Sequence, residues 1–294
     1  MIKSLILATA ISAAFGVQAQ HSTAGTFAPE AAAHKDLKWP GAAEKFTGQS
    51  LDNKIFQPAN PSSQPSPAVI LLHSCAGITN RNEGHLKRWV EFLTNNGFVV
   101  MVPNHLETRG AAKPVGAECS GKTRQVKMGR LVKDIYDGVE HLGNVPGVDK
   151  NRIFTLGFSL GGMSGGLAAS PAVYDEVAKG RTRPRAIGSL YGACQGSVTN
   201  FLPLDSNLPV LWLMGKDDTE APAANCEASV KSIKARVPQS HFHVYDSATH
   251  SWDVKELSGT SRTAGNGVKV TYLYNEEVTK DSMKRTLDFF NSFK

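Results

Sequence analysis

Six short apolar runs follow one another along the chain from residue 68 onward, at 68–72, 98–102, 153–156, 186–190, 210–214 and 242–245. They show almost no alternation of polar and apolar positions, which is typical of parallel strands buried on both faces. Two stretches between them, 83–95 and 127–142, have apolar residues at helical spacing, and helices are also expected at 223–236 and 276–293. This pattern predicts an α/β fold, with a mostly parallel sheet covered by helices on both faces.

The first nineteen residues form a different pattern, MIKSLILATAISAAFGVQA. Lys3 is their only charge, an apolar run extends from Leu5 to Val17, and Ala19 is small enough for a cleavage site. This is typical of a secretory signal peptide. A short membrane anchor is the alternative, but the run is shorter than the ~20 residues that span a bilayer. We therefore expect an exported protein, periplasmic or secreted after cleavage near Ala19, without a stable membrane anchor.

The remaining chain is expected to form one large domain. Residues 20–50 show no strong period and are interpreted as an N-terminal extension that lies over a domain at 51–294. The chain carries a net charge of +6, but its densest basic cluster, Arg181 to Arg185, has no interleaved aromatic residues and no zinc-finger spacing. A solvated loop is therefore expected there, and no nucleic-acid partner. The oligomeric state is not indicated.

Four cysteines are present, Cys75, Cys119, Cys194 and Cys226, and an even number in an exported protein predicts disulfides. Neither a C-x-x-C nor an H-x-x-x-H motif occurs, so no metal site is expected. Three pairings are possible. Each cysteine follows a predicted strand, and neighbouring strands end at one edge of the sheet. We therefore expect Cys75 to pair with Cys119 and Cys194 with Cys226.

The stretch GFSLGGMSGG at 157–166 contains the pattern G-x-S-x-G twice, centred on Ser159 and on Ser164. Ser159 directly follows a predicted strand and precedes small residues that can start a helix. A nucleophile elbow needs this strand–turn–helix context, because the sharp turn exposes the hydroxyl above the sheet. Ser164 follows Leu-Gly-Gly-Met and is expected to pack one turn into the helix. Ser159 is therefore the candidate nucleophile.

A serine hydroxyl needs an oriented histidine as base, and on this architecture the acid and then the histidine follow the serine. His241 and His243 alternate within a predicted strand, whereas His250 comes just after its carboxyl end. His250 is therefore the candidate base. Asp217 and Asp218 compete as the acid, and the spacing Gly-x-x-Asp-x-x-x-Pro favours Asp218, with Asp217 as a loop-capping residue.

With these residues placed, the chain resembles the dienelactone hydrolase family of α/β-hydrolases, in particular its exported members with a serine nucleophile. The resemblance covers about residue 55 to the C-terminus. It rests on an ordered set of short motifs: Leu71-Leu-His-Ser-Cys-Ala-Gly77, Gly157-Phe-Ser-Leu-Gly-Gly162, Gly215-Lys-Asp-Asp218 with Pro222, Thr249-His250-Ser251 and Tyr274-Asn-Glu-Glu277.

The resemblance implies that Ser159, Asp218 and His250 form a catalytic triad, and that the backbone N–H groups of Cys75 and Leu160 form the oxyanion hole. Dienelactone hydrolase itself has a cysteine in place of the serine. It also binds a substrate carboxylate through arginine, and residues 251–255 contain none. His73, in the first motif, is interpreted as a residue that fixes the oxyanion loop.

The expected reaction is hydrolysis of a small-molecule carboxylic ester or lactone through an acyl-enzyme, without a metal or organic cofactor. A peptidase or acyltransferase on the same triad is one alternative, and a non-catalytic binding protein on this scaffold is another. The 17 residues between Tyr191 and Pro209 are too few for a helical cap domain. Loops 104–124, with Arg109, and 252–271 are therefore expected to cover the site. Trp252 would either line an acyl pocket or pack in the core.

Overall fold

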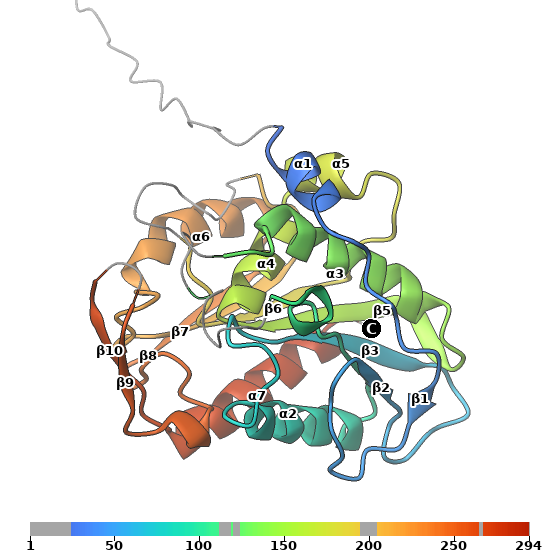
Figure 1. Cartoon of the computed structure of the whole chain (residues 1–294), viewed down its shortest axis with the longest axis horizontal. Coiled ribbons are helices and arrows are strands. Elements are labelled where there is room, and N and C mark those ends of the chain that lie inside the picture. Colours follow the sequence, from blue (N-terminus) through green and yellow to red (C-terminus); the bar gives the residue numbers. More distant parts are fainter. Residues whose placement is uncertain (1–24, 112–118, 120–123, 195–204, 265–266, 294) are drawn as a thin grey trace, which may run out of the picture.

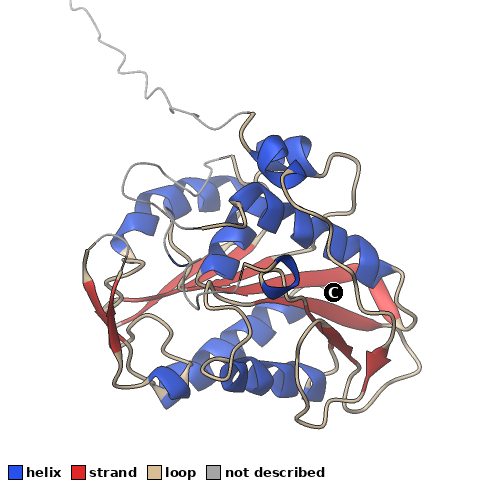
Figure 2. Ribbon diagram, viewed as in Figure 1, coloured by secondary structure: helices blue, strands red, loops and turns tan. Residues whose placement is uncertain are grey.

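The computed structural model describes residues 25–111, 119, 124–194, 205–264 and 267–293. The expected signal peptide at 1–19 lies outside them. A central sheet of eight strands runs through the molecule in the order β1-β2-β4-β3-β5-β6-β7-β8, with β2 antiparallel to β4 and all other pairs parallel (Figure 2). The strands are β1 Ala43–Glu44, β2 Lys54–Phe56, β3 Ser66–Leu72, β4 Val99–Val102, β5 Val148–Phe158, β6 Ile187–Leu190, β7 Val210–Gly215 and β8 His241–Tyr245.

Helices cover both faces of the sheet (Figure 1). On one face lie α3 (Met128–Gly143), α4 (Leu160–Ala168) and α6 (Ala224–Arg236), and on the other lie α2 (Glu83–Asn95) and α7 (Glu276–Asn291). Two short helices, α1 (Phe27–Ala32) and α5 (Pro171–Val177), lie beside each other next to α3, and a separate hairpin consists of β9 (Ser261–Thr263) and β10 (Lys269–Thr271). The expected α/β fold with a mostly parallel sheet is confirmed, and the described residues form no cap domain.

The apolar runs are continuous because successive side chains enter different cores. Ile70 of β3 packs in the core beneath α3, whereas its neighbours Val69 and Leu71 pack in the core beneath α2 and α7. Trp89 of α2 and Phe290 of α7 are completely buried in that second core. Burying a large apolar side chain contributes about 2 kcal/mol, so both helical layers stabilise the sheet. No helix in the described ranges is long and apolar enough to cross a membrane.

The expected N-terminal extension joins the same folded unit. Its residues form α1, which packs on α3 and α5, and β1, which pairs with β2 at the edge of the sheet. Arg130 of α3 is almost fully buried and binds Asp134 at 2.6 Å, Asp137 at 3.2 Å and Asp36 of the extension at 2.8 Å. The buried guanidinium of Arg130 is thus paired by several carboxylates, one of which the extension supplies.

Arg109 belongs to this network and not to the cover of the site. Its guanidinium binds both carboxylate oxygens of Asp134, at 2.7 and 2.9 Å, and its Nε donates to the carbonyl of Lys35. The loop that follows β4 is therefore anchored to α3 and to the extension. Of the expected covering loop at 104–124, residues 112–118 and 120–123 lie outside the described residues.

Candidate active site

Ser159 occupies a strained turn between β5 and α4. Its φ of 52° is in the region that non-glycine residues rarely adopt. A Cβ at Gly157 would lie 2.2 Å from the carbonyl carbon of Gly161, and a Cβ at Gly161 would lie 2.3 Å from the carbonyl oxygen of Leu72. Both positions therefore require glycine, as the nucleophile-elbow pattern predicts. The turn places the Ser159 hydroxyl above the carboxyl edge of the sheet.

Ser164 lies within α4, as its position in the motif suggested. Its side chain is 2% exposed, and its hydroxyl donates to the carbonyl of Gly161 at 2.9 Å. A hydroxyl in this position back-bonds along its own helix. Ser164 therefore packs against the sheet and does not reach the cavity that contains Ser159.

His250 and Asp218 lie next to Ser159 in a continuous hydrogen-bonded chain. His250 Nε2 is 3.0 Å from Ser159 Oγ, and His250 Nδ1 is 2.7 Å from Asp218 Oδ2. The other Asp218 oxygen accepts from the backbone N–H groups of Glu220, at 2.8 Å, and Ala221, at 2.7 Å. Because the Asp218 carboxylate accepts a hydrogen bond from Nδ1, that nitrogen carries the imidazole proton. Nε2 is then free to accept a proton from serine.

Asp217 takes no part in the hydrogen bonds that join Asp218, His250 and Ser159. Its side chain is exposed, whereas Asp218 is buried. A glycine at position 215 makes the arrangement possible, since a Cβ there would lie 2.2 Å from the carbonyl oxygen of Ala248. The loops that follow β7 and β8 therefore touch, which brings Asp218 from the first loop to His250 in the second.

Two carboxylates act on the His250 ring, and only one of them is hydrogen-bonded to it. Asp218 is the bonded one, and Glu220 Oε2 lies 3.8 Å from Nε2. Burial lowers the pKa of His250, but the negative charges of Asp218 and Glu220 outweigh this and raise its pKa above the ordinary value. The two carboxylates thus favour the imidazolium that forms when His250 accepts a proton.

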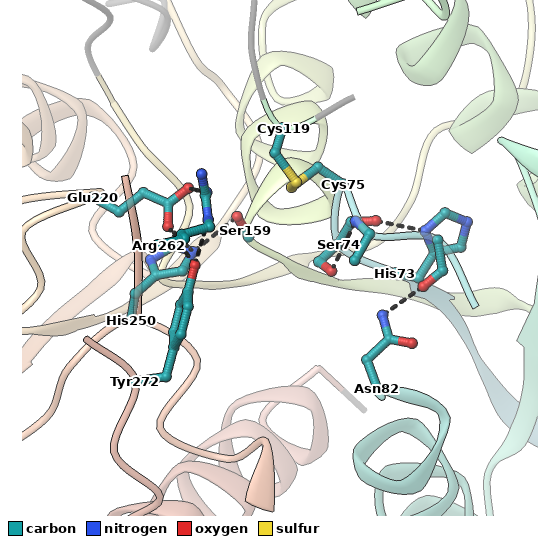
Figure 3. Close-up of a disulfide and its surroundings, with 12 residues drawn as sticks. His73, Ser74, Cys75, Asn82, Cys119, Ser159, Glu220, His250, Arg262 and Tyr272 are labelled. Carbon is teal, nitrogen blue, oxygen red and sulfur yellow. Dashed lines mark hydrogen bonds and ion pairs between the residues drawn. A yellow bond between two sulfur atoms is a disulfide. The ribbon is translucent and has the colours of Figure 1, made fainter. Parts of the chain in front are cut away.

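The two N–H groups expected to form an oxyanion hole come from the residue after Ser159 and from the loop after β3. Leu160 is the first residue of α4, where the helix dipole favours a negative charge. Cys75 follows β3, borders the same cavity and is joined to Cys119 by a disulfide (Figure 3). In the described part of the chain, neither N–H donates to a protein acceptor.

Asn82 restrains the loop that follows β3 and carries Cys75, here called the oxyanion loop, and this role was not predicted. Its side-chain amide donates to the carbonyl of Gly77 at 2.5 Å, and its amide oxygen accepts from the backbone N–H of Thr79 at 2.8 Å. The second disulfide joins Cys194 to Cys226. Both cysteine pairs are those expected from the order of the strands.

A cavity of about 200 Å³ opens in front of Ser159 and His250. The loop 252–271 lines it as expected, with Val254, Leu257, Thr260, Ser261 and Arg262. Trp252 does not line it. That ring is completely buried and packs against Tyr191, with 4.8 Å between centroids, and against Tyr245, so it belongs to the core.

Several other residues of the cavity wall gave no signal in the sequence. Tyr191 lies with its ring edge-on to His250, at 4.9 Å between centroids, and its hydroxyl donates to Asp253 at 2.7 Å. His85 is buried in the wall, and neither of its ring nitrogens has a partner among the described residues. Arg81 and Arg262 also line the cavity, although residues 251–255 contain no arginine.

No cluster of three or more metal-ligating side chains occurs within the described ranges. The sheet order and the position of the serine turn, aspartate and histidine after β5, β7 and β8 define an α/β-hydrolase. More specifically, residues 51–294 match the model of the dienelactone hydrolase family, and the chain belongs to that family. It is accordingly a carboxylic ester hydrolase.

Individual relatives are distant. A Yersinia pestis protein named “Putative carboxymethylenebutenolidase” is 23% identical over 253 residues, which cover 83% of this chain and 84% of the relative. A crystal structure from Klebsiella pneumoniae, titled “Putative Dienelactone Hydrolase”, has a TM-score of 0.59 at 21% identity and covers 80% of this chain and 90% of that one. A Thermogutta terrifontis esterase with bound butyrate has a TM-score of 0.54 at 12% identity, over 81% of this chain and 88% of that one. At these identities the two structures show a shared fold.

Beneath the oxyanion loop, His73 and His105 form a buried stacked pair. Their ring centroids are 3.8 Å apart at an interplanar angle of 8°. His73 Nδ1 donates to the carbonyl of Ser74 at 2.7 Å, so His73 helps to fix the loop. Burial lowers the pKa of His73 to about 4 and the pKa of His105 well below its ordinary value of 6.5. Both rings are therefore neutral in the folded protein.

This pair predicts a specific loss of stability in acid. The unfolded protein binds protons on both imidazoles below pH 6.5 and the folded protein does not, so stability is present above pH 6.5 and falls below it. Between pH 7.5 and pH 5, His105 should therefore contribute to the loss in the free energy of unfolding. His105→Phe keeps a flat ring but cannot titrate, so urea unfolding of this variant should show a smaller loss than wild type over the same pH range. An equal loss in both proteins would contradict this account.

Proposed function

We propose that this protein hydrolyses carboxylic esters or lactones by a serine mechanism in which Ser159 is the nucleophile, His250 the base and Asp218 the orienting acid. The observation that carries the proposal is the hydrogen-bonded chain from Asp218 through His250 to Ser159, with both distances within bonding range. Such a chain is what a serine hydroxyl needs to become nucleophilic.

In the proposed reaction, His250 Nε2 takes the proton from Ser159 Oγ as the oxygen attacks the carbonyl carbon of the substrate. Collapse of the tetrahedral intermediate breaks the ester bond, and the imidazolium donates its proton to the leaving alkoxide. Water then enters, His250 takes one of its protons, and the resulting hydroxide attacks the acyl-enzyme. The acid product leaves, and Ser159 recovers its proton.

The N–H groups of Leu160 and Cys75 would hold the oxyanion in both steps. A donor placed in this way contributes about 3 kcal/mol to the transition state. The Cys75–Cys119 disulfide and the Asn82 side chain support this role, because the disulfide restrains Cys75 itself and Asn82 restrains the residues that follow it.

For the substrate, we propose a small ester or lactone. Arg81 supports an anionic substituent, since this arginine lines the cavity beside Ser159 and His250. Relatives in Yersinia pestis and Salmonella typhimurium carry the name “Putative carboxymethylenebutenolidase”, the name of an enzyme that acts on a carboxylate-bearing lactone. A panel of neutral esters, neutral lactones, a carboxylate-bearing lactone and peptides would rank these classes and would also distinguish a peptidase or an acyltransferase.

We further propose that the protein is exported with cleavage near Ala19. Two disulfides support this, since such bonds form and persist in oxidising compartments. The protein recovered from a periplasmic or culture fraction should begin near Gln20 and contain no free thiols, by intact mass with and without alkylation. A protein that begins at Met1 and carries four free thiols would contradict export.

Replacing Ser159 by Ala should reduce ester turnover to background and leave the thermal midpoint nearly unchanged, because it removes one hydroxyl from a partly exposed turn. Ser164→Ala is the matched control. It removes a hydroxyl that bonds only within α4, so turnover should remain within about twofold of wild type. Loss of activity in Ser164→Ala, with Ser159→Ala active, would place the nucleophile elsewhere.

Replacing Asp218 by Asn should lower kcat by roughly 10⁴-fold, because an amide at this position cannot hold the required tautomer of His250. The unfolding midpoint should change little. Asp217→Asn makes the same chemical change one residue earlier, on an exposed side chain, and should leave kcat nearly unchanged. Steady-state kinetics with one activated ester measures both, and the opposite ranking would assign the acid to Asp217.

A further inference from the structure

Glu220 lies beside the nitrogen of His250 that faces Ser159. Its Oε2 is 3.8 Å from Nε2, which is beyond hydrogen-bond distance but close enough for a strong electrostatic interaction. The side chain is mostly buried, so water screens this interaction only in part. Asp218, in contrast, contacts the opposite nitrogen of the same ring. A positive charge on His250 would therefore lie between two carboxylates.

The hairpin of β9 and β10 holds Glu220 in this position. Arg262 of β9 binds Oε1 of Glu220, and the hydroxyl of Tyr272, just after β10, donates to Oε2 at 3.2 Å. Arg262 Nε also donates to the Tyr272 oxygen at 2.6 Å, so the two clamping groups fix each other. Figure 3 shows Glu220, Arg262 and Tyr272 grouped around His250, on the side away from Cys75.

This clamp has a consequence for proton transfer. An unrestrained glutamate at this distance could swing toward Nε2 and accept the proton that the imidazolium must deliver to the leaving group. With both of its oxygens engaged by Arg262 and Tyr272, Glu220 stays beyond hydrogen-bond reach. It can then stabilise the positive charge on His250 without competing for its proton.

We propose that Glu220 is a positioning residue for the hydrolytic reaction: it stabilises the His250 imidazolium, while Arg262 and Tyr272 keep it from capturing the proton. This inference rests on the proposed function, since it assumes that His250 accepts the Ser159 proton. Glu220 would act through His250 and need not touch the substrate.

The groups that face His250 define the expected pH dependence. Asp218 and Glu220, from the loop after β7, favour the charged ring, whereas burial and Arg262, from the hairpin, oppose it. Tyr191 and Tyr272 contact the ring as neutral phenols. Burial and the Asp253 charge hold the pKa of Tyr191 well above its ordinary value, and burial and the Glu220 charge raise that of Tyr272 to about 12. Of the three charged side chains that act on His250, Asp218 also bonds to the ring. Replacing Glu220 or Arg262 should therefore shift the pKa of His250 and leave its bond to Asp218 in place.

The two removals should act in opposite directions. His250 must be neutral to accept a proton, so activity falls below its pKa. Glu220→Gln removes a negative charge and lowers the pKa of His250, which should move the acid limb of the kcat/KM profile to lower pH. Arg262→Gln frees Glu220 and raises this pKa, which should move the limb to higher pH. The double variant should lie between the two single variants, because Arg262 also acts on His250 directly through its own charge.

The experiment is a pH series of kcat and kcat/KM on one neutral activated ester, for wild type and these three variants. On the alkaline plateau, Glu220→Gln should lose roughly tenfold in kcat, far less than the roughly 10⁴-fold expected for Asp218→Asn. Arg262→Lys keeps the positive charge and should leave the limb close to wild type. Asp217→Asn, which removes an exposed negative charge from the same loop, should leave both the limb and the plateau unchanged.

Limbs that do not move, or that move in the same direction in Glu220→Gln and Arg262→Gln, would overturn the role of Glu220 and leave the triad intact. Turnover that survives in Ser159→Ala would instead overturn the proposed function and this inference together. Because each single variant has its own predicted direction, either one decides the proposal if the other does not fold.

Discussion

Between β5 and α4 the backbone turns so sharply that a single methyl group on either flanking glycine would overlap main-chain atoms. The Cβ of an alanine at position 157 would lie 2.2 Å from the backbone of Gly161, and at position 161 it would lie 2.3 Å from the Leu72 carbonyl. Only this turn gives Ser159 a φ of 52° and directs its hydroxyl out of the sheet. The proposed base, acid and oxyanion donors all depend on the position of that hydroxyl.

The remaining groups reach Ser159 because parallel strands end at one edge of the sheet. The loops after β3, β7 and β8 supply Cys75, Asp218 and His250, and the close contact at Gly215 joins the last two loops. Two rigid cores hold the strand ends in place, and each loop is then restrained separately: by a disulfide at Cys75, and by backbone N–H donors at Asp218. If these residues act as proposed, their geometry would need little rearrangement when a substrate binds.

Much of the architecture could be predicted because its signals are local. The helix expected at 83–95 has the same bounds as α2, and every expected apolar run became a strand. Strand β5 begins at Val148, five residues before its apolar run. Residues 149–152 are polar and not fully buried, so the apolar pattern could not reveal them. Strands β1 and β2 have only two and three residues, which is too short for a detectable period. Helix α5 could have been found, since Ser170 caps it and a proline follows.

The candidate triad was accessible from the sequence because its order along the chain and its position after strands are properties of the architecture. Glu220, Arg262 and Tyr272 were not, since the contact between Glu220 and Arg262 spans 42 positions and depends on a hairpin of two three-residue strands. Arg109 was placed at the site because it follows β4, yet its side chain turns to the buried carboxylate of Asp134. Side-chain direction within a loop is decided by such long-range partners.

The central claim, that Ser159 is the residue made nucleophilic by His250, can be tested directly by covalent labelling. A fluorophosphonate should react once per chain, and peptide mass spectrometry should place the adduct on Ser159, within the peptide that also contains Ser164. Labelling should be lost in Ser159→Ala and strongly slowed in His250→Ala. An adduct on Ser164 or on any residue outside the cavity, or labelling that does not depend on His250, would contradict the account.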